Sequence, residues 1–137
     1  ALERIEMLED TVAESAEILK SDQGRVVERV VALVEQNRKL EKDIARLARL
    51  QRQIIGQAAA LLKKGGTMLY VTCTVTREEN EETIRASLRQ NPCLVLEDLG
   101  SRIPAWGAGL VDDQGFFRTL PHRDRMDGFF AALLTKE

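Results

Sequence analysis

The sequence predicts an α/β chain in which an N-terminal helical hairpin is joined to a small mixed sheet carrying one helix. Two observations support this fold class. Apolar residues recur every three or four positions up to about residue 63, and β-branched runs separated by turn signals follow the Gly65-Gly66 pair. We therefore expect a coiled-coil-like hairpin over residues 1–64 and a strand-helix-strand-strand unit over residues 65–137. The 137 residues, 44% of them hydrophobic and 31% charged, are enough for one modest core.

The first half of the chain has the period of amphipathic helices. One apolar stripe runs from Leu2 to Leu19, and "KSDQG" then interrupts it. A longer stripe follows in an alternating four-three register, formed by Val26, Val30, Leu33, Leu40, Ile44, Leu47, Ile54, Ala58 and Leu61, with Asn37 and Gln51 as polar exceptions. Such a stripe usually packs against its own partner helix, whereas a buried Asn37 would favour register-specific pairing with a second chain.

The second half of the chain reads as strands around one helix. The run "TMLYVTCTV", residues 67–75, predicts a strand covered on both faces in a parallel sheet. Thr76 and Glu79 form a capping-box pattern for a helix running to about Arg89. "CLVLEDL", "FFRTL" and "GFFAALLTK" read as further strands, and "SRIPAWGAGLVDDQG" reads as a loop.

The first predicted strand would normally be central in its sheet, so its free edge would expose unpaired backbone groups. We therefore expect a homo-oligomer, assembled through the helices or through this sheet edge.

Composition excludes several classes of function. The formal net charge of −2 gives no general attraction to nucleic acid or to an acidic membrane. Two cysteines are neither a disulfide framework nor a CxxC metal pair, so no metal site is expected. No apolar run is long enough to span a bilayer. We expect a cytoplasmic protein with no membrane partner.

Cys73 is the first candidate functional residue. Within the predicted strand it is either a reactive nucleophile or a small apolar filler, because buried thiols are usually inert. Cys93, at a predicted strand start, is expected to be half-buried. Trp106 is expected to anchor its loop. Adjacent phenylalanines should place one ring inward and one outward; these are Phe116 with Phe117 and Phe129 with Phe130.

A small basic cluster near the C-terminus could bind RNA phosphates. Its residues are Arg118, His122, Arg123 and Arg125. The alternative is that these are solvated loop charges paired with Asp124 and Asp127, since nucleic-acid footprints usually cover a broader basic patch.

Two motifs in the second half carry a family resemblance. Thr72-Cys73-Thr74 before "EENEE", and "PHRDRMDGFF" near the end, make residues 44–136 resemble the C-terminal part of the Sun (Fmu) family of RNA cytosine-5 methyltransferases. Thr74 stands where the family commonly has serine, and Lys64 where proline is common. The resemblance implies a Rossmann-like methyltransferase fold, S-adenosylmethionine as cofactor, and Cys73 as the nucleophile that adds to carbon 6 of cytosine.

The first segment resembles a different protein. "VVERVVALVEQNRKLEK" and its flanks make residues 4–47 similar to the helical linker of alanyl-tRNA synthetases. Since the two resemblances overlap at "KDIARLARLQRQI", we expect a chimaera or a fragment.

The sequence lacks the cofactor-binding pattern of such a methyltransferase. No glycine-rich strand-to-helix turn is present, and Gly65-Gly66 precedes a strand instead. We therefore expect no cofactor in this chain and a vestigial Cys73. The leading hypothesis is a non-catalytic, truncated or chimaeric fragment of an RNA cytosine-5 methyltransferase. The alternatives are a coiled-coil oligomerisation module and a weak RNA-binding module acting through residues 118–125.

Overall fold

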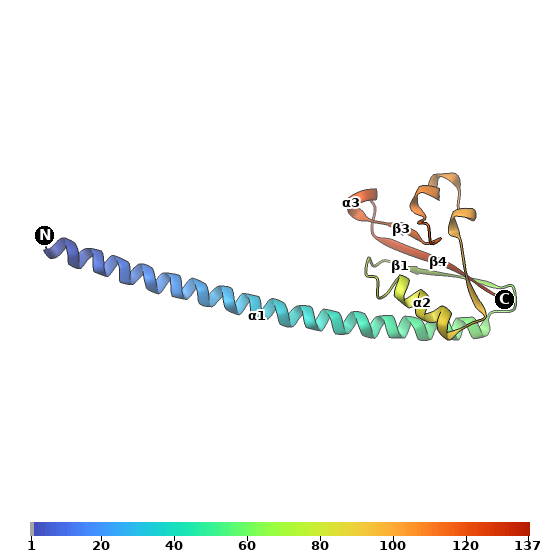
Figure 1. Cartoon of the computed structure of the whole chain (residues 1–137), viewed down its shortest axis with the longest axis horizontal. Helices are drawn as coiled ribbons and strands as arrows, with labels where there is room; N and C mark the ends of the chain where they lie inside the picture. Colours follow the sequence, from blue (N-terminus) through green and yellow to red (C-terminus); the bar gives the residue numbers. More distant parts are fainter. Residues whose placement is uncertain (1) are drawn as a thin grey trace. The chain divides into compact units, whose positions relative to one another are not determined.

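The computed structural model describes the backbone of residues 2–137 and the side chains of Met7 and residues 10–137. Two compact units form, Ala1–Lys42 and Asp43–Glu137. A single helix, α1, spans Leu2–Leu61 (Figure 1), so the predicted helical hairpin is wrong. The helix continues because "KSDQG" contains no proline and its one glycine costs a helix interior only about 1 kcal/mol relative to alanine.

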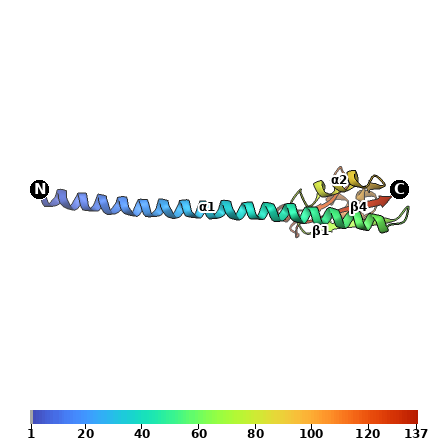
Figure 2. The same ribbon diagram turned by 90° about the horizontal axis from the view of Figure 1, so that it is seen from below.

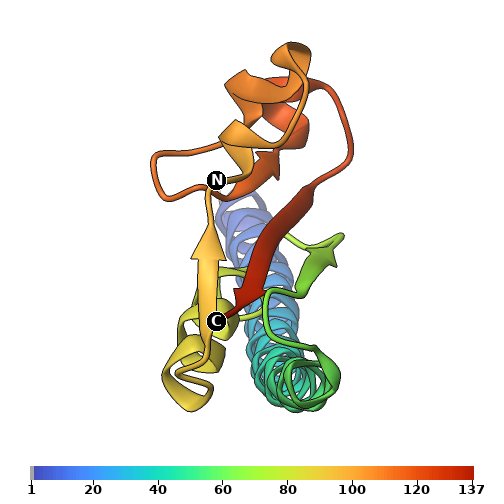
Figure 3. The ribbon, with the colours of Figure 1, turned by 90° about the vertical axis from the view of Figure 1, so that its right-hand side faces the viewer.

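The sheet of the second unit is antiparallel in all three pairings between its named strands. These strands are β1 (Thr67–Thr72), β2 (Leu94–Glu97), β3 (Phe117–Thr119) and β4 (Phe129–Lys136). β4 lies between β1 and β2 and also pairs with β3 (Figure 3). The predicted mixed sheet is therefore wrong as to pairing, although β1 and β2 run parallel to each other on either side of β4.

One face of the sheet carries the core. The helix α2 (Glu81–Gln90) and the last turns of α1 lie on this face (Figure 2). Alternate residues of β4 point toward them, and the core cluster comprises Ile55, Ala59, Ile84, Leu94, Phe116, Phe130, Ala132 and Leu134. The core residues recur every second position along β4 and every fourth along α1, as expected for a strand and a helix that each turn one face toward the core. The phenylalanine prediction is confirmed, since Phe116 and Phe130 are buried while Phe129 is exposed.

The opposite face of β1 remains open. Leu69 is 58% exposed and Val71 is 53% exposed, so the prediction of a strand covered on both faces is wrong. Within residues 2–137, β1 pairs with β4 alone, which leaves its other edge free as the sequence suggested. Half-burial explains the alternating exposure of β1 along its length.

The connections refine the predicted boundaries. Gly65, at φ 76°, makes the turn after α1, and its N–H donates to the Lys136 carbonyl at 2.6 Å. The predicted loop contains two short 3-10 helices, η1 (Leu99–Ser101) and η2 (Ala105–Leu110). A four-residue helix, α3 (Pro121–Asp124), occupies part of the basic segment and was not predicted.

Candidate functional site

Cys73 lies on an exposed bend directly after β1. The predicted buried strand over residues 67–75 ends at Thr72, so the interpretation of Cys73 as an apolar core filler is wrong. Beyond the last ladder pair, Thr72 with Phe130, the Thr74 carbonyl accepts a hydrogen bond from the Asn80 side chain. An accessible thiol after a sheet strand has the exposure that a nucleophile needs.

A polar network holds the bend against the helices. Thr76 Oγ1 donates to Glu79 Oε2 at 3.1 Å, and Gln51 Nε2, from α1, donates to Glu79 Oε1 at 2.9 Å. The Tyr70 hydroxyl donates to the Glu79 carbonyl at 2.6 Å. Burial, with the Glu79 carboxylate nearby, raises the pKa of Tyr70 well above its ordinary value of 10.0. The predicted capping box is wrong, because α2 begins only at Glu81 with Asn80 at its N-cap position; Thr76 and Glu79 instead bond side chain to side chain in the turn before the helix.

The pairing of β1 with β4 brings the basic segment to the same end of the sheet as Cys73. Thr72, the last residue of β1, lies opposite Phe130. Val75 also packs against the backbone just before β4, because a Cβ built on Gly128 would lie 2.7 Å from Val75 Cγ1. In Figure 1, α3 and the turn after β1 are seen at the same end of the second unit. We name the cysteine bend and residues 121–128, which lie at the same end of the sheet, the cysteine edge.

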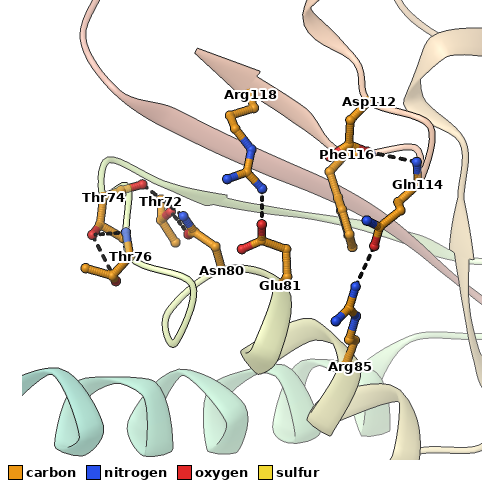
Figure 4. A network of polar contacts seen from close by, with 10 residues as sticks. All are labelled: Thr72, Thr74, Thr76, Asn80, Glu81, Arg85, Asp112, Gln114, Phe116 and Arg118. Carbon is orange, nitrogen blue, oxygen red and sulfur yellow. Dashed lines mark hydrogen bonds and ion pairs between the residues drawn. The ribbon is translucent and has the colours of Figure 1, made fainter. Parts of the chain in front are cut away.

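Two members of the predicted basic cluster make contacts within the fold. Arg118, on β3, pairs with Glu81 of α2 (Figure 4), and its guanidinium carbon lies 5.5 Å from the centroid of the Phe130 ring. Arg123 Nε donates to Asp124 Oδ1 at 2.8 Å, and Arg123 Nη2 donates to the Arg118 carbonyl. The pairing with Asp124 agrees with the alternative of paired loop charges.

The other two members, His122 and Arg125, are exposed beside Arg123. Asp124 fixes this turn because its carboxylate also accepts the Leu120 N–H at 2.7 Å. The hydrogen bonds from Arg123 and Leu120 hold the pKa of Asp124 below its ordinary value of 3.8. Of the four basic residues, His122, Arg123 and Arg125 are exposed, with Arg123 paired to Asp124, whereas Arg118 is mostly buried against Glu81.

The strand-to-helix turn of this unit does not fit a nucleotide-like cofactor. Residues 73–80, between β1 and α2, contain no glycine, and the N–H groups of Asn80 and Glu82 both donate to the Arg77 carbonyl. Free backbone donors and a glycine turn are what a cofactor cradle at a helix N-terminus requires. No group of three or more metal-ligating side chains occurs among the described residues. None of the helices described has a stretch apolar and long enough to cross a membrane.

A family of RNA-modifying enzymes matches this chain. The family model of 16S rRNA methyltransferase RsmB/F matches residues 24–135, which is most of the chain. This chain belongs to the RsmB/F family of rRNA methyltransferases. The family uses S-adenosylmethionine. The match begins well before residue 44, so much of the segment likened to the alanyl-tRNA synthetase linker lies inside the RsmB/F match.

Curated relatives of the RsmB/F chain carry the same description. "Probable ribosomal RNA small subunit methyltransferase B" of Bacillus subtilis (strain 168) is 41% identical over 96 residues, covering 69% of this chain and 21% of the relative. "Ribosomal RNA small subunit methyltransferase B" of Salmonella newport (strain SL254) is 38% identical over 97 residues, covering 71% and 20%. The chain spans about a fifth of the length of these relatives.

Solved structures share the fold of this RsmB/F chain. A methyltransferase homolog protein from Pyrococcus horikoshii has a TM-score of 0.57 and 30% identity, covering 70% of this chain and 33% of that one. NSun6 from Pyrococcus horikoshii, solved with SFG, has a TM-score of 0.52 and 36% identity, covering 65% and 22%. The prediction of a methyltransferase-like α/β fold is confirmed at this level.

Two further expectations, for Cys93 and for Trp106, are wrong. Cys93 is exposed just before β2, not half-buried. Trp106 is 79% exposed and so does not anchor its loop. Sequence pattern does not single out Asn80, which contacts both neighbours of Cys73. The lone asparagine among the four glutamates of "EENEE" is the signal that could identify it.

Proposed function

We propose that this chain provides the nucleophile-bearing edge of an rRNA cytosine-5 methyltransferase site, and that it does not methylate RNA by itself. The exposed position of Cys73 after β1, at the same end of the sheet as the basic residues of the cysteine edge, is the observation that supports the first part. The glycine-free turn after β1 supports the second, because it offers no cradle for S-adenosylmethionine.

The proposed chemistry is covalent addition to the pyrimidine ring. The thiolate of Cys73 forms a bond from Sγ to carbon 6 of cytosine while the C5–C6 π bond breaks, and its electron pair makes carbon 5 nucleophilic enough to accept a methyl group. A sulfonium donor held outside this chain would supply the methyl group and leave as a thioether, and loss of the carbon 5 proton would then release the thiolate. His122, Arg123 and Arg125 would hold RNA phosphates near the cysteine while the target base is extruded from its stack.

Disulfide capture tests the first part. An RNA oligonucleotide carrying a cytosine with a short mixed-disulfide tether is incubated with the chain, and a Cys thiolate that attacks the tether releases a small thiol. Cys93 is a matched internal control because it is also free and exposed. We expect capture by Cys73 to be faster than capture by Cys93. Equal capture rates would contradict a cytosine-binding surface at the cysteine edge.

Calorimetric titration with S-adenosylmethionine tests the second part. We expect no heat of binding up to millimolar cofactor, and no transfer of labelled methyl groups to RNA. Micromolar binding would mean that assembled chains rebuild a cofactor site, and the non-catalytic assignment would be wrong.

A second candidate function is assembly of two copies of the chain along α1. Much of the four-three stripe is open. In the first unit Val26, Val30, Leu33 and Leu40 are each half exposed or more. In the second unit α1 joins the core through Ile55 and Ala59, and Ile54 of the stripe stays 56% exposed, whereas Ile44 and Ala58 are partly buried. β-branched residues and leucines alternate along the stripe, and Asn37 interrupts it once in the first unit, a pattern typical of two-stranded pairing.

The oligomeric state tests this second candidate. We expect the chain to dissociate with dilution in sedimentation velocity, and Leu40→Asp combined with Leu47→Asp to give monomers. Lys42→Asp is the control, since Lys42 is exposed and lies outside the stripe. A monomeric parent chain at all concentrations would contradict the proposal.

The resemblance to an alanyl-tRNA synthetase linker stays a prediction. The RsmB/F match from residue 24 onward counts against it for residues 24–47.

A further inference from the structure

The side chain of Asn80 bridges the two residues that flank Cys73. Thr72 Oγ1 donates to Asn80 Oδ1 at 2.5 Å, and Asn80 Nδ2 donates to the Thr74 carbonyl at 3.0 Å (Figure 4). Asn80 is only 1% exposed, so both hydrogen bonds are shielded from competing water. One buried amide therefore fixes the chain on each side of the bend.

This contact replaces the usual local role of asparagine. Asn80 occupies the N-cap position of α2, where an asparagine side chain normally accepts a backbone N–H of the first helical turn. Here the side chain makes no such cap bond. The Asn80 side chain thus gives up a stabilising cap bond and makes the two bonds to the cysteine bend in its place.

The rest of the bend supports the same geometry. Thr74 Oγ1 accepts the Thr76 N–H at 3.2 Å, and the two threonine hydroxyls share a further hydrogen bond. With Thr72 held inward by Asn80, the next side chain along an extended backbone points the opposite way, which is the exposed side where Cys73 lies. The direction of the thiol thus depends on contacts that Cys73 itself does not make.

We infer that Asn80 is a positioning residue that holds the bend 72–76 and so aims the Cys73 thiol outward from the end of β1. The role of Cys73 as a nucleophile rests on the proposed function, but the positioning of the bend by Asn80 does not. The test of the inference therefore measures the mobility of the bend itself, with no RNA and no cofactor. It can fail or succeed independently of the capture and titration experiments.

The test is ¹⁵N relaxation of the backbone amides of residues 72–76 in the whole chain. In the parent chain we expect order parameters near 0.85 at Cys73 and Thr74, and in Asn80→Ala we expect them to fall below about 0.6. Thr72→Val removes one of the two bridging bonds and should cause part of this loss, whereas Thr72→Ser keeps the hydroxyl and should restore rigidity.

Thr83→Val is the matched control for general destabilisation. Thr83 is buried on the same helix, and its hydroxyl donates to the Glu78 carbonyl at 2.7 Å without touching the bend. We expect it to lower the melting temperature and leave the order parameter of Cys73 unchanged. If Asn80→Ala does not fold, the Thr72→Val and Thr72→Ser pair decides the question. Order parameters near 0.85 in every folded variant, or an equal loss in Thr83→Val, would overturn the inference.

Discussion

Removing the guanidinium of Arg118 separates a structural role for this residue from a role in RNA binding. Arg118 pairs with Glu81 across the gap between β3 and α2, and the side chains are only 21% and 12% exposed. Glu81 Oε2 is already buried without a hydrogen-bond partner, so Arg118 is the group that compensates this carboxylate. Arg118→Met keeps an unbranched side chain at this position and removes the charge, together with the guanidinium that lies over the Phe130 ring.

The expected cost follows from leaving a carboxylate unpaired. Breaking a fully buried ion pair costs about 3–5 kcal/mol, and the partial exposure of this pair reduces the expected value to about 2–3 kcal/mol. For a unit of this size such a loss lowers the melting temperature by roughly 10–15 °C. Glu81→Gln combined with Arg118→Met should recover most of the stability, because no uncompensated charge then remains.

Thermal and urea unfolding of the four chains of this double-mutant cycle measure the effect. The control is Arg125→Met, which alters an exposed arginine of the same basic segment and should change stability by less than about 0.5 kcal/mol. Equal stability of Arg118→Met and Arg125→Met, or a coupling energy below about 0.5 kcal/mol, would refute a structural role for the Arg118–Glu81 pair.

Three further outcomes are expected. Tyr70 is the sole tyrosine, so its ionisation can be followed by absorbance at 295 nm. Because the pKa of Tyr70 is raised in the folded chain, its contribution to stability is complete below pH 10 and is lost as the pH rises further. Ionisation of Tyr70 near pH 10 in the folded chain would contradict this expectation. The triple variant His122→Ala, Arg123→Ala, Arg125→Ala should weaken RNA binding and lower the slope of log affinity against log salt by about 0.7 per lost phosphate contact, with an unchanged slope excluding these residues as phosphate ligands. Ile84→Ala, at a fully buried position of α2, should cost about 2–5 kcal/mol by chemical denaturation, and a cost below about 1 kcal/mol would mean that α2 does not pack on the sheet as described.

Local sequence pattern was sufficient for most elements of the second unit. The strands β2, β3 and β4 and the helix α2 were predicted because each has its own period and turn signals. The prediction for the first unit was wrong at "KSDQG", since a polar interruption with one glycine is compatible with both a turn and a continuous helix. The choice between a turn and a continuous helix depends on small free-energy differences, which cannot be obtained from the spacing of apolar residues.

By itself the sequence determined the family motifs, the candidate nucleophile and the basic residues, because these are properties of residue type and spacing. The tertiary structure decided that Cys73 is exposed and that residues 121–128 lie beside it, because the β1–β4 register joins segments more than fifty positions apart. It also decided that Arg118 pairs with Glu81 and that Asn80 holds the cysteine bend. Side-chain partners are set by packing between distant segments, and no local pattern in the chain records them.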